Sequence, residues 1–201
     1  MTKNLELKDF MNGKVDAASI KNKYLKDVTK KSKNTRITFL TPNVVGSKSQ
    51  ARRVQPPLGI ACLAGVLDEY GFNKLQIIDS SAEGYNEVRD LEGDFIEFGL
   101  KDEDVIKKLN NFQPHIVGIS ALFSSQFGCA ERIGKEIKKK FPNTILVYGG
   151  IHASKEYDNI LKENRYIDYI ITGEADYTFT VFCDLFEKKK KFKGLSFTSV
   201  F

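Results

Sequence analysis

Short apolar runs alternate with longer amphipathic segments from Arg36 onward. Each short run is almost continuously apolar, which is typical of parallel strands covered by helices on both faces. We therefore predict five strands, over residues 37–40, 75–78, 116–119, 144–148 and 169–171.

The segments between these runs have the length and apolar spacing of helices. Pro56 and Pro57 stand where the first helix would begin, Gly71 follows its end, and Pro114 and Pro142 precede later strands. We predict helices over residues 58–70, 102–109, 126–141, 153–162 and 178–188. Five alternating strand–helix units predict a doubly wound α/β fold with a five-stranded parallel sheet.

Two connections are longer than such a fold requires, and both follow the carboxyl ends of predicted strands: residues 41–55 and 80–100. Long connections in a compact domain are commonly functional or disordered. In an open parallel sheet the ligand lies outside the carboxyl ends of the strands. We therefore expect a binding site at that edge of the sheet.

The first 34 residues differ from the rest of the chain. Asp16 could cap a helix in this segment, with lysines on its polar faces. The apolar side of that helix would be Ile20, Tyr24, Leu25 and Val28. We predict a lysine-rich helical extension over residues 1–34 and one domain over residues 35–201.

The formal net charge of +5 comes entirely from this extension. Its nine lysines face four acidic residues, whereas the remaining 22 basic and 22 acidic residues of the chain cancel. The domain therefore lacks the basic excess that marks a nucleic-acid-binding surface, and we expect no nucleic-acid partner.

No apolar run approaches the roughly 20 residues of a membrane-spanning helix, and the amino terminus lacks the apolar core of a secretory signal. We expect a soluble cytoplasmic protein without a membrane partner. The three cysteines, Cys62, Cys129 and Cys183, lie far apart among apolar residues. This pattern predicts small buried side chains, and neither a disulfide framework nor a metal site.

Several familiar ligand sites are missing from the predicted strand ends. A dinucleotide site needs a glycine-rich turn after a strand, and residues 41–46 do not supply one. A Walker-type phosphate loop, a serine nucleophile elbow and clustered metal ligands are also missing. The carboxylates of a phosphate-accepting regulator are absent, because Thr41 and Ser120 stand at the relevant strand ends. We assign no catalytic residue and no metal ligand.

Small uncharged residues stand at two neighbouring strand ends instead: Ser120 after the third predicted strand, and Gly149 and Gly150 after the fourth. Glycines without Cβ atoms let a ligand press on the backbone, and a serine hydroxyl both donates and accepts hydrogen bonds. A plain tight turn is the alternative interpretation of the paired glycines.

The sequence Ser120-Ala121-Leu122 followed by Gly149-Gly150 resembles the Ser-x-Leu and Gly-Gly motifs of cobalamin-binding domains similar to those of methionine synthase and the mutases. In that family the pair lines a slot for the dimethylbenzimidazole tail. The family also places Asp-x-His-x-x-Gly after the first strand, whereas residues 41–55 contain no histidine. The resemblance therefore implies cobalamin bound without a protein histidine as lower cobalt ligand.

The chain more closely resembles the amino-terminal cobalamin-binding domains of cobalamin-dependent radical SAM enzymes. Five segments carry this resemblance in the family's order, namely Pro56-Pro57-Leu58-Gly59, Ile77-Ile78-Asp79, Pro114 to Ser120, Gly149-Gly150-Ile151-His152 and Gly173-Glu174 to Thr178-Phe179. The resemblance extends from residue 37 to about residue 195, roughly three quarters of the chain. The resemblance implies the cobalamin-binding fold, a flavodoxin-like or Rossmann-like sheet.

The resemblance also implies a cofactor-binding set at the carboxyl edge of the sheet. Its members are Thr41, Pro42, Leu58, Gly59, Ser80, Ser120, Leu122, Phe123, Ser124, Gly149, Gly150, His152, Gly173 and Glu174. His152 could contact the corrin or a partner domain, or be a surface or capping residue. Glu174 could contact the ligand or stabilise the start of the last helix.

Other residues have simpler interpretations. His115 precedes a strand and therefore lies at the opposite edge, where we expect a structural role. Arg52 and Arg53 could meet corrin amide oxygens or be solvated. The helical spacing of Phe179, Phe182 and Phe186 predicts core packing.

The resemblance implies a module that binds cobalamin for a radical SAM catalytic domain, present in cis or in trans. By resemblance, methylcobalamin would deliver a methyl group to a substrate radical, although related proteins close rings instead. The Cys-x3-Cys-x2-Cys motif that holds a 4Fe–4S cluster is missing from this sequence. We therefore expect S-adenosylmethionine and the cluster to belong to an absent catalytic domain, and the chain alone to bind cofactor without turnover.

Two further functions stay open. A domain of this fold could have lost cobalamin and serve as an interaction or substrate-recognition module, because fold does not fix function. A flavodoxin-like electron carrier is disfavoured, since the first long connection lacks phosphate-binding character.

Overall fold

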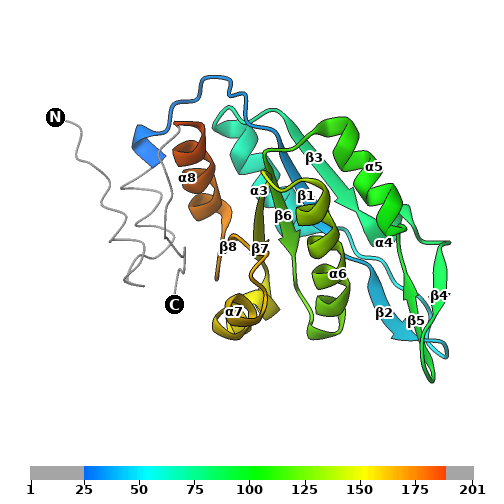
Figure 1. The fold of residues 1–201 in the computed structure, drawn as a ribbon. Coiled ribbons are helices and arrows are strands. Elements are labelled where there is room, and N and C mark those ends of the chain that lie inside the picture. The colour runs from blue at the N-terminus through cyan, green and yellow to red at the C-terminus, as the bar shows by residue number, and fades with distance from the viewer. Residues whose placement is uncertain (1–24, 189–201) are drawn as a thin grey trace.

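Five parallel strands form the central sheet, in the order β3-β1-β6-β7-β8 (Figure 1). The computed structural model describes residues 25–188 of the chain. The strands are β1 (Ile37–Thr41), β3 (Leu75–Asp79), β6 (Ile116–Ser120), β7 (Ile145–Gly149) and β8 (Tyr169–Ile170). All five predicted strands are confirmed, with ends that differ by at most one residue.

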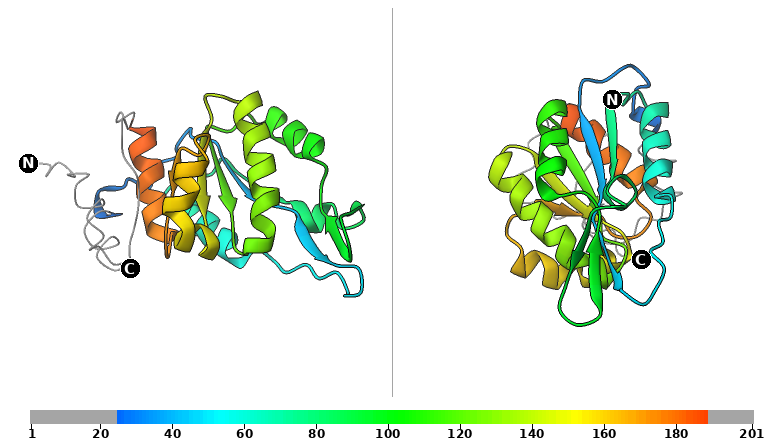
Figure 2. Two further views of the ribbon diagram at one scale, coloured as in Figure 1. Left: turned by 60° about the horizontal axis from the view of Figure 1, so that its bottom comes forward. Right: turned by 90° about the vertical axis from the view of Figure 1, so that its right-hand side faces the viewer.

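The helices that cover the sheet are α3 (Leu58–Glu69), α5 (Asp102–Phe112), α6 (Ser124–Lys140), α7 (Ile151–Glu163) and α8 (Asp176–Glu187). Helices α3 and α8 pack together on one face, while α5, α6 and α7 lie on the other (Figure 2). The predicted doubly wound α/β architecture is therefore confirmed, and each predicted helix is present.

Both faces of the parallel sheet are apolar because the strands carry apolar residues in almost every position. Ile119 and Leu146 lie in the core beneath α5, α6 and α7. Phe39 lies in the core beneath α3 and α8, with its ring centroid 5.4 Å from that of Phe179. Phe179 and Phe182 are buried, which confirms that the phenylalanine stripe of α8 serves packing.

The two long connections contain a second, smaller sheet that the sequence analysis missed. It consists of β2 (Val44–Ser47), β5 (Phe95–Phe98) and β4 (Val88–Asp90), antiparallel in that order. A short helix, α4 (Ser80–Glu83), precedes it in the second connection. These strands are only three or four residues long, and β2 pairs with a segment some fifty residues later. Strands this short give no strong periodic signal in the sequence, and pairing between distant segments gives none either.

The described part of the amino-terminal extension begins with a single 3-10 turn, Leu25–Asp27. Leu25 and Val28 are buried against Val181 and Leu185 of α8, so this stretch packs on the domain. The predicted cap Asp16 and the positions Ile20 and Tyr24 lie outside the described residues. The division of the chain at residue 34 stays a prediction.

Two of the three cysteines are buried as predicted, but the prediction is wrong for Cys62, which is exposed. Cys62 lies on α3 opposite the face that Ile60 and Leu67 bury. Burial raises the pKa of Cys129 to about 11, which makes its thiol a poor nucleophile. Among the helices within residues 25–188, none is both long and apolar enough to cross a membrane.

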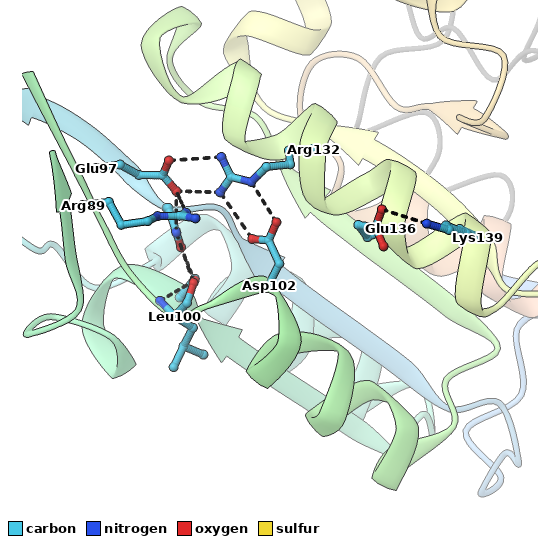
Figure 3. Close-up of polar contacts among 9 residues, drawn as sticks. Arg89, Glu97, Leu100, Asp102, Arg132, Glu136 and Lys139 are labelled. Atoms are coloured by element: carbon cyan, nitrogen blue, oxygen red, sulfur yellow. Dashed lines mark hydrogen bonds and ion pairs between the residues drawn. The ribbon is translucent and has the colours of Figure 1, made fainter. Parts of the chain in front are cut away.

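The carboxylate of Glu97 on β5 joins the small sheet to the helices of the large one (Figure 3). Glu97 is 3% exposed and accepts hydrogen bonds from Arg132 of α6 at 2.6 and 3.0 Å and from the Asn43 amide at 2.7 Å. Arg89 of β4 also pairs with it. Arg132 in turn donates to Asp102 of α5 at 2.8 and 3.3 Å. This polar cluster therefore fixes the small sheet beside α5 and α6.

The charges of this cluster are mutually stabilised. Burial disfavours the ionised carboxylate of Glu97, but hydrogen bonds from Arg132 and Asn43 outweigh burial and hold its pKa below the usual value. Burial likewise disfavours the charge on Arg132, yet hydrogen bonds to Asp102 and Glu97 raise its pKa.

Replacing Arg132 should destabilise the fold, because it leaves two carboxylates without their shared partner. We expect Arg132→Met to lower the free energy of unfolding by about 2 kcal/mol, less than for fully buried pairs because the Arg132 side chain is 37% exposed. The measurement is urea denaturation followed by circular dichroism. Lys139→Met removes an exposed pair with Glu136 and is the matched control, expected to change stability by less than about 0.5 kcal/mol. Equal effects of the two substitutions would contradict the structural importance of the cluster.

The lowered pKa of Glu97 also predicts how stability depends on pH. A carboxyl group whose pKa is lower in the folded state stabilises the fold above its unfolded pKa, and this contribution disappears as the pH falls through the folded value. We expect the unfolding free energy to fall below about pH 4.5, with a shallower fall for Glu97→Gln. Denaturation curves at several pH values between about 6 and about 3 test this expectation; identical slopes for the two proteins would contradict it.

Candidate functional site

The carboxyl ends of β6 and β7 bring the serine and the paired glycines of the sequence analysis side by side. Ser120 and Gly149 are register partners on these neighbouring strands. The Ala121 N–H donates to the Gly149 carbonyl at 2.7 Å, and the His152 N–H donates to the Ala121 carbonyl at 3.1 Å. Backbone hydrogen bonds therefore hold the connection after β6 against the connection after β7.

The two glycines are required for different reasons. Gly150 has φ +100°, and a Cβ there would lie 2.7 Å from the Ala121 carbonyl oxygen, so the turn itself needs glycine. Gly149 has no such constraint, because its Cβ would meet only the Ile171 carbonyl oxygen, at an ordinary 3.7 Å. The turn thus explains Gly150, while Gly149 leaves space at the strand end that a side chain would fill.

A third connection, after β8, is tied to the same edge. Gly173 has φ +72°, and its N–H donates to the hydroxyl oxygen of Ser154 on α7 at 3.0 Å. Glu174 follows with an exposed side chain. Within residues 25–188, α8 begins at Asp176 without a side-chain cap, so the structure does not support a capping role for Glu174.

Exposed apolar side chains surround this edge, and we call them the apolar rim. They are Leu58 at the start of α3, Leu122 and Phe123 before α6, and Ile151 at the start of α7, with exposed fractions of 71%, 40%, 58% and 61%. Sequence reasoning did not include Ile151 in the predicted set, although it lies between Gly150 and His152. Apolar residues gathered at one place on a surface mark a ligand or protein contact.

A groove of about 510 Å³ runs between the start of α6 and the length of α7. Four residues of the predicted set line it together, namely Leu122, Phe123, Ser124 and His152. The His152 ring packs on Phe127 with ring centroids 4.7 Å apart, and its Nδ1 lies 3.0 Å from the Ser124 hydroxyl oxygen. His152 is therefore a half-buried wall residue with a defined orientation.

Three members of the predicted set are buried or hydrogen-bonded within the protein. Ser80 is 1% exposed; its hydroxyl donates to the Asn43 side chain and accepts from the Leu100 N–H, so the structure gives it an internal role. Thr41 donates to the Asp79 carboxylate at 2.9 Å, and Pro42 is buried. The remaining early member, Gly59, is exposed in the first turn of α3. The edge is therefore built mainly by β6, β7 and the connections that follow them.

The other charged candidates have protein partners. The Arg52 guanidinium lies 4.4 Å from the ring centroid of Tyr85 and donates to the Tyr85 carbonyl. Arg53 is exposed. His115 Nδ1 accepts from the Arg36 N–H at 3.0 Å at the amino edge of the sheet, and burial lowers the pKa of His115. The structural role predicted for His115 is confirmed.

The edge combines apolar side chains with the amino termini of several helices. In the described part of the chain, His, Cys, Asp and Glu form no group of three that could hold a metal ion. Helices α3, α6, α7 and α8 begin at this edge without a side-chain hydrogen bond at their caps. The positive ends of their dipoles favour an anionic or oxygen-rich ligand.

A comparison with protein families agrees with the motifs. The family model described as "B12 binding domain" matches residues 48–182, which is about two thirds of the chain. Its match covers β6, β7 and the connections that carry the paired glycines.

Three curated relatives are similar over most of this chain. The cytidylyl-2-hydroxyethylphosphonate methyltransferase of Streptomyces wedmorensis is 30% identical over 74% of this chain and 28% of its own length. The anaerobic magnesium-protoporphyrin IX monomethyl ester cyclase of Cereibacter sphaeroides is 28% identical over 81% of this chain and 25% of its own. An uncharacterized methyltransferase of Pyrococcus horikoshii is 30% identical over 79% and 31%. The chain therefore spans about a quarter to a third of the length of these relatives.

The different constraints on the two glycines predict different effects of the same substitution. We expect Gly150→Ala to lower the free energy of unfolding by about 2 kcal/mol, because the added Cβ meets Ala121 in a backbone conformation that disfavours L residues. Gly149→Ala should leave stability within about 1 kcal/mol of the parent chain. Urea denaturation of both variants checks this, and a Gly150→Ala variant as stable as the parent would show that the turn tolerates a side chain.

Proposed function

Because this chain belongs to the B12-binding domain family, we propose that it binds one cobalamin at the carboxyl edge of its parallel sheet, with the nucleotide tail received at Ser120 and Gly149. The observation that carries the placement is the space beside Gly149, which a Cβ would enter without touching other side chains. If the paired glycines served only to make a tight turn, the turn would need glycine at position 150 but not at position 149.

The residues around this space fit the chemistry of cobalamin. The apolar rim of Leu58, Leu122, Phe123 and Ile151 offers surfaces for the flat corrin ring. The Ser120 hydroxyl supplies a compact donor and acceptor for the tail. Uncapped helix starts favour the phosphate of the nucleotide and the amide oxygens of the corrin periphery. Of the predicted set, Ser80 is not part of this proposal, because it is internal.

We propose that no protein histidine binds the cobalt. The sequence contains two histidines, and His115 lies at the far edge of the sheet. His152 is held by Ser124 and Phe127 in the wall of the groove between α6 and α7. Its role in this proposal is to orient the start of α7 and contact the edge of the ligand.

We further propose that the chain serves a radical SAM catalytic domain, in cis or in trans. Two relatives are named as methyltransferases and one as a cyclase, and the motifs resemble those of cobalamin-dependent radical SAM enzymes. Bound cobalamin would supply methyl-transfer chemistry, while S-adenosylmethionine and a 4Fe–4S cluster would belong to the other domain. The residues of this chain bind and orient the cofactor and shield it from water.

A second candidate function rests on the same apolar rim. Exposed leucine, isoleucine and phenylalanine side chains fit a protein surface as well as a corrin ring. The chain could then recognise a partner or its substrate without cobalamin. Capture of a radical SAM partner by cobalamin-free protein, with no change when cobalamin is added, would favour this function.

The direct test is a visible spectrum. After the purified chain is mixed with hydroxocobalamin and free ligand is removed by gel filtration, we expect one corrinoid per chain. Its spectrum should lack the features of dimethylbenzimidazole or histidine ligation to cobalt. Folded protein that retains no corrinoid would contradict cobalamin binding by the chain alone, and a histidine-ligated spectrum would contradict the proposed coordination.

A glycine-to-leucine pair tests where the cofactor binds. We expect Gly149→Leu to lose at least about tenfold in cobalamin affinity with little loss of stability, because the side chain fills the proposed tail site. Gly65→Leu is the matched control, since Gly65 is exposed on α3 and its Cβ would meet no atom within 4 Å. Equal affinities of the two variants would exclude the Gly149 site.

A further inference from the structure

We infer that the small antiparallel sheet is a side wall of the cobalamin site and that Phe95 on its α6-facing side contacts the corrin ring. The inference rests on the proposed function and adds a residue and a surface to it. Phe95 is 55% exposed at the outer end of β5, a segment that sequence reasoning left as a loop.

The small sheet lies on the same side of the domain as the proposed cobalamin site. Strand β2 begins three residues after β1 ends, and the β4–β5 hairpin lies between β3 and α5. The small sheet therefore leaves the parallel sheet from its carboxyl side, where it extends beyond the body of the domain (Figures 1 and 2). The small sheet therefore borders the edge at which we propose that cobalamin binds.

Glu97 determines which side of the small sheet faces α6. Its carboxylate is bonded to Arg132, as Figure 3 shows, and alternate residues of a strand share a face. Phe95, two residues earlier, is therefore on the α6-facing side. The register pairs Phe95 with Ser47 and Phe98 with Val44, so Phe95 is at the end of β5 that is farther from β1.

Phe95 is also displaced toward the start of α6. Arg132 comes eight residues after Ser124, which is about 12 Å along the helix axis. Phe95 is beyond Glu97 by two residues, or about 7 Å of extended strand. Because α6 starts at the carboxyl edge, this step carries Phe95 toward the part of the apolar rim formed by Leu122 and Phe123.

The opposite side of the small sheet is closed by its own contacts. Phe98 is buried there, with the Tyr85 ring edge-on at a centroid distance of 6.0 Å and the Arg52 guanidinium at 5.9 Å. Val88 pairs with Phe98 and shares that side, where it is 44% exposed. Among the residues of β2, β4 and β5, Phe95 is thus the most exposed apolar side chain on the side that faces α6, with Leu91 beside it, whose N–H donates to the Phe95 carbonyl at 3.0 Å.

The corrin ring is the occupant that this position favours. Polar groups adjoin Phe95 on the same wall: the Ser47 hydroxyl bonds to Asp94, and Arg89 pairs with Glu97 while about half exposed. The corrin ring has an apolar face with amide side chains around it. The Phe95 ring could contact that face, and the polar groups beside Phe95 could bind the amides. The buried Glu97–Arg132 contact holds the wall at a fixed distance from α6, as a preformed site requires.

The test compares two serine substitutions in the full chain, Phe95→Ser and Val88→Ser, by spectroscopic titration with hydroxocobalamin. We expect the dissociation constant to rise about tenfold for Phe95→Ser and less than about twofold for Val88→Ser. Phe95→Leu should restore most of the affinity, because it keeps an apolar contact. Urea denaturation should show both serine variants folded, since both residues are substantially exposed.

The outcomes separate this inference from the proposed function. Failure of the unsubstituted chain to bind cobalamin would overturn the proposed function and the inference with it. If the parent chain and Phe95→Ser bound cobalamin equally well, the inference that Phe95 contacts the corrin ring would be overturned, while the proposed function would stand. A Phe95→Ser variant that binds cobalamin normally but no longer captures a radical SAM partner would also overturn it, and would identify a protein-docking surface instead.

Discussion

The buried carboxylate of Glu97 is the constraint on which the arrangement of the two sheets depends. A charged group at 3% exposure is costly unless nearby donors satisfy it, and here Arg132, Asn43 and Arg89 do so together. The donors come from α6, from β4 and from the connection between β1 and β2, so their contacts with one carboxylate fix these three segments relative to one another. The packing near Gly84 and Gly99 is equally close, since a Cβ on Gly84 would lie 2.1 Å from the Gly99 carbonyl carbon.

The site itself is built from backbone more than from reactive side chains. The register of β6 and β7 brings Ser120 to Gly149, and the turn at Gly150 requires a positive φ. The space at Gly149 is then a consequence of two strands ending at the same level beside a sharp turn. A site of this kind selects a ligand by shape and by apolar contact.

Periodicity predicted the parallel sheet well because each strand is buried on both faces and each helix has one apolar side. It failed for β2, β4 and β5, which are only three or four residues long. Strand β2 pairs with a segment some fifty residues later, and the short β4–β5 hairpin is held by Glu97 rather than by a local pattern. The motifs located Ser120, Gly149 and Gly150, whereas Ser80 proved internal and Cys62 exposed. Ile151 and Phe95 could not be predicted, since a sequence does not reveal which apolar residues stay exposed after folding.

The proposed absence of a histidine on cobalt gives the side wall its importance. Without that coordinate bond, the binding free energy of cobalamin would come from the tail at Gly149 and from contacts around the corrin ring. The apolar rim provides contacts from α3, α6 and α7, all of which belong to the common doubly wound framework. Phe95 would add a contact from an element outside that framework, held in place by a charge cluster about two turns along α6. The same cluster that fixes the fold would then also fix one boundary of the cofactor site.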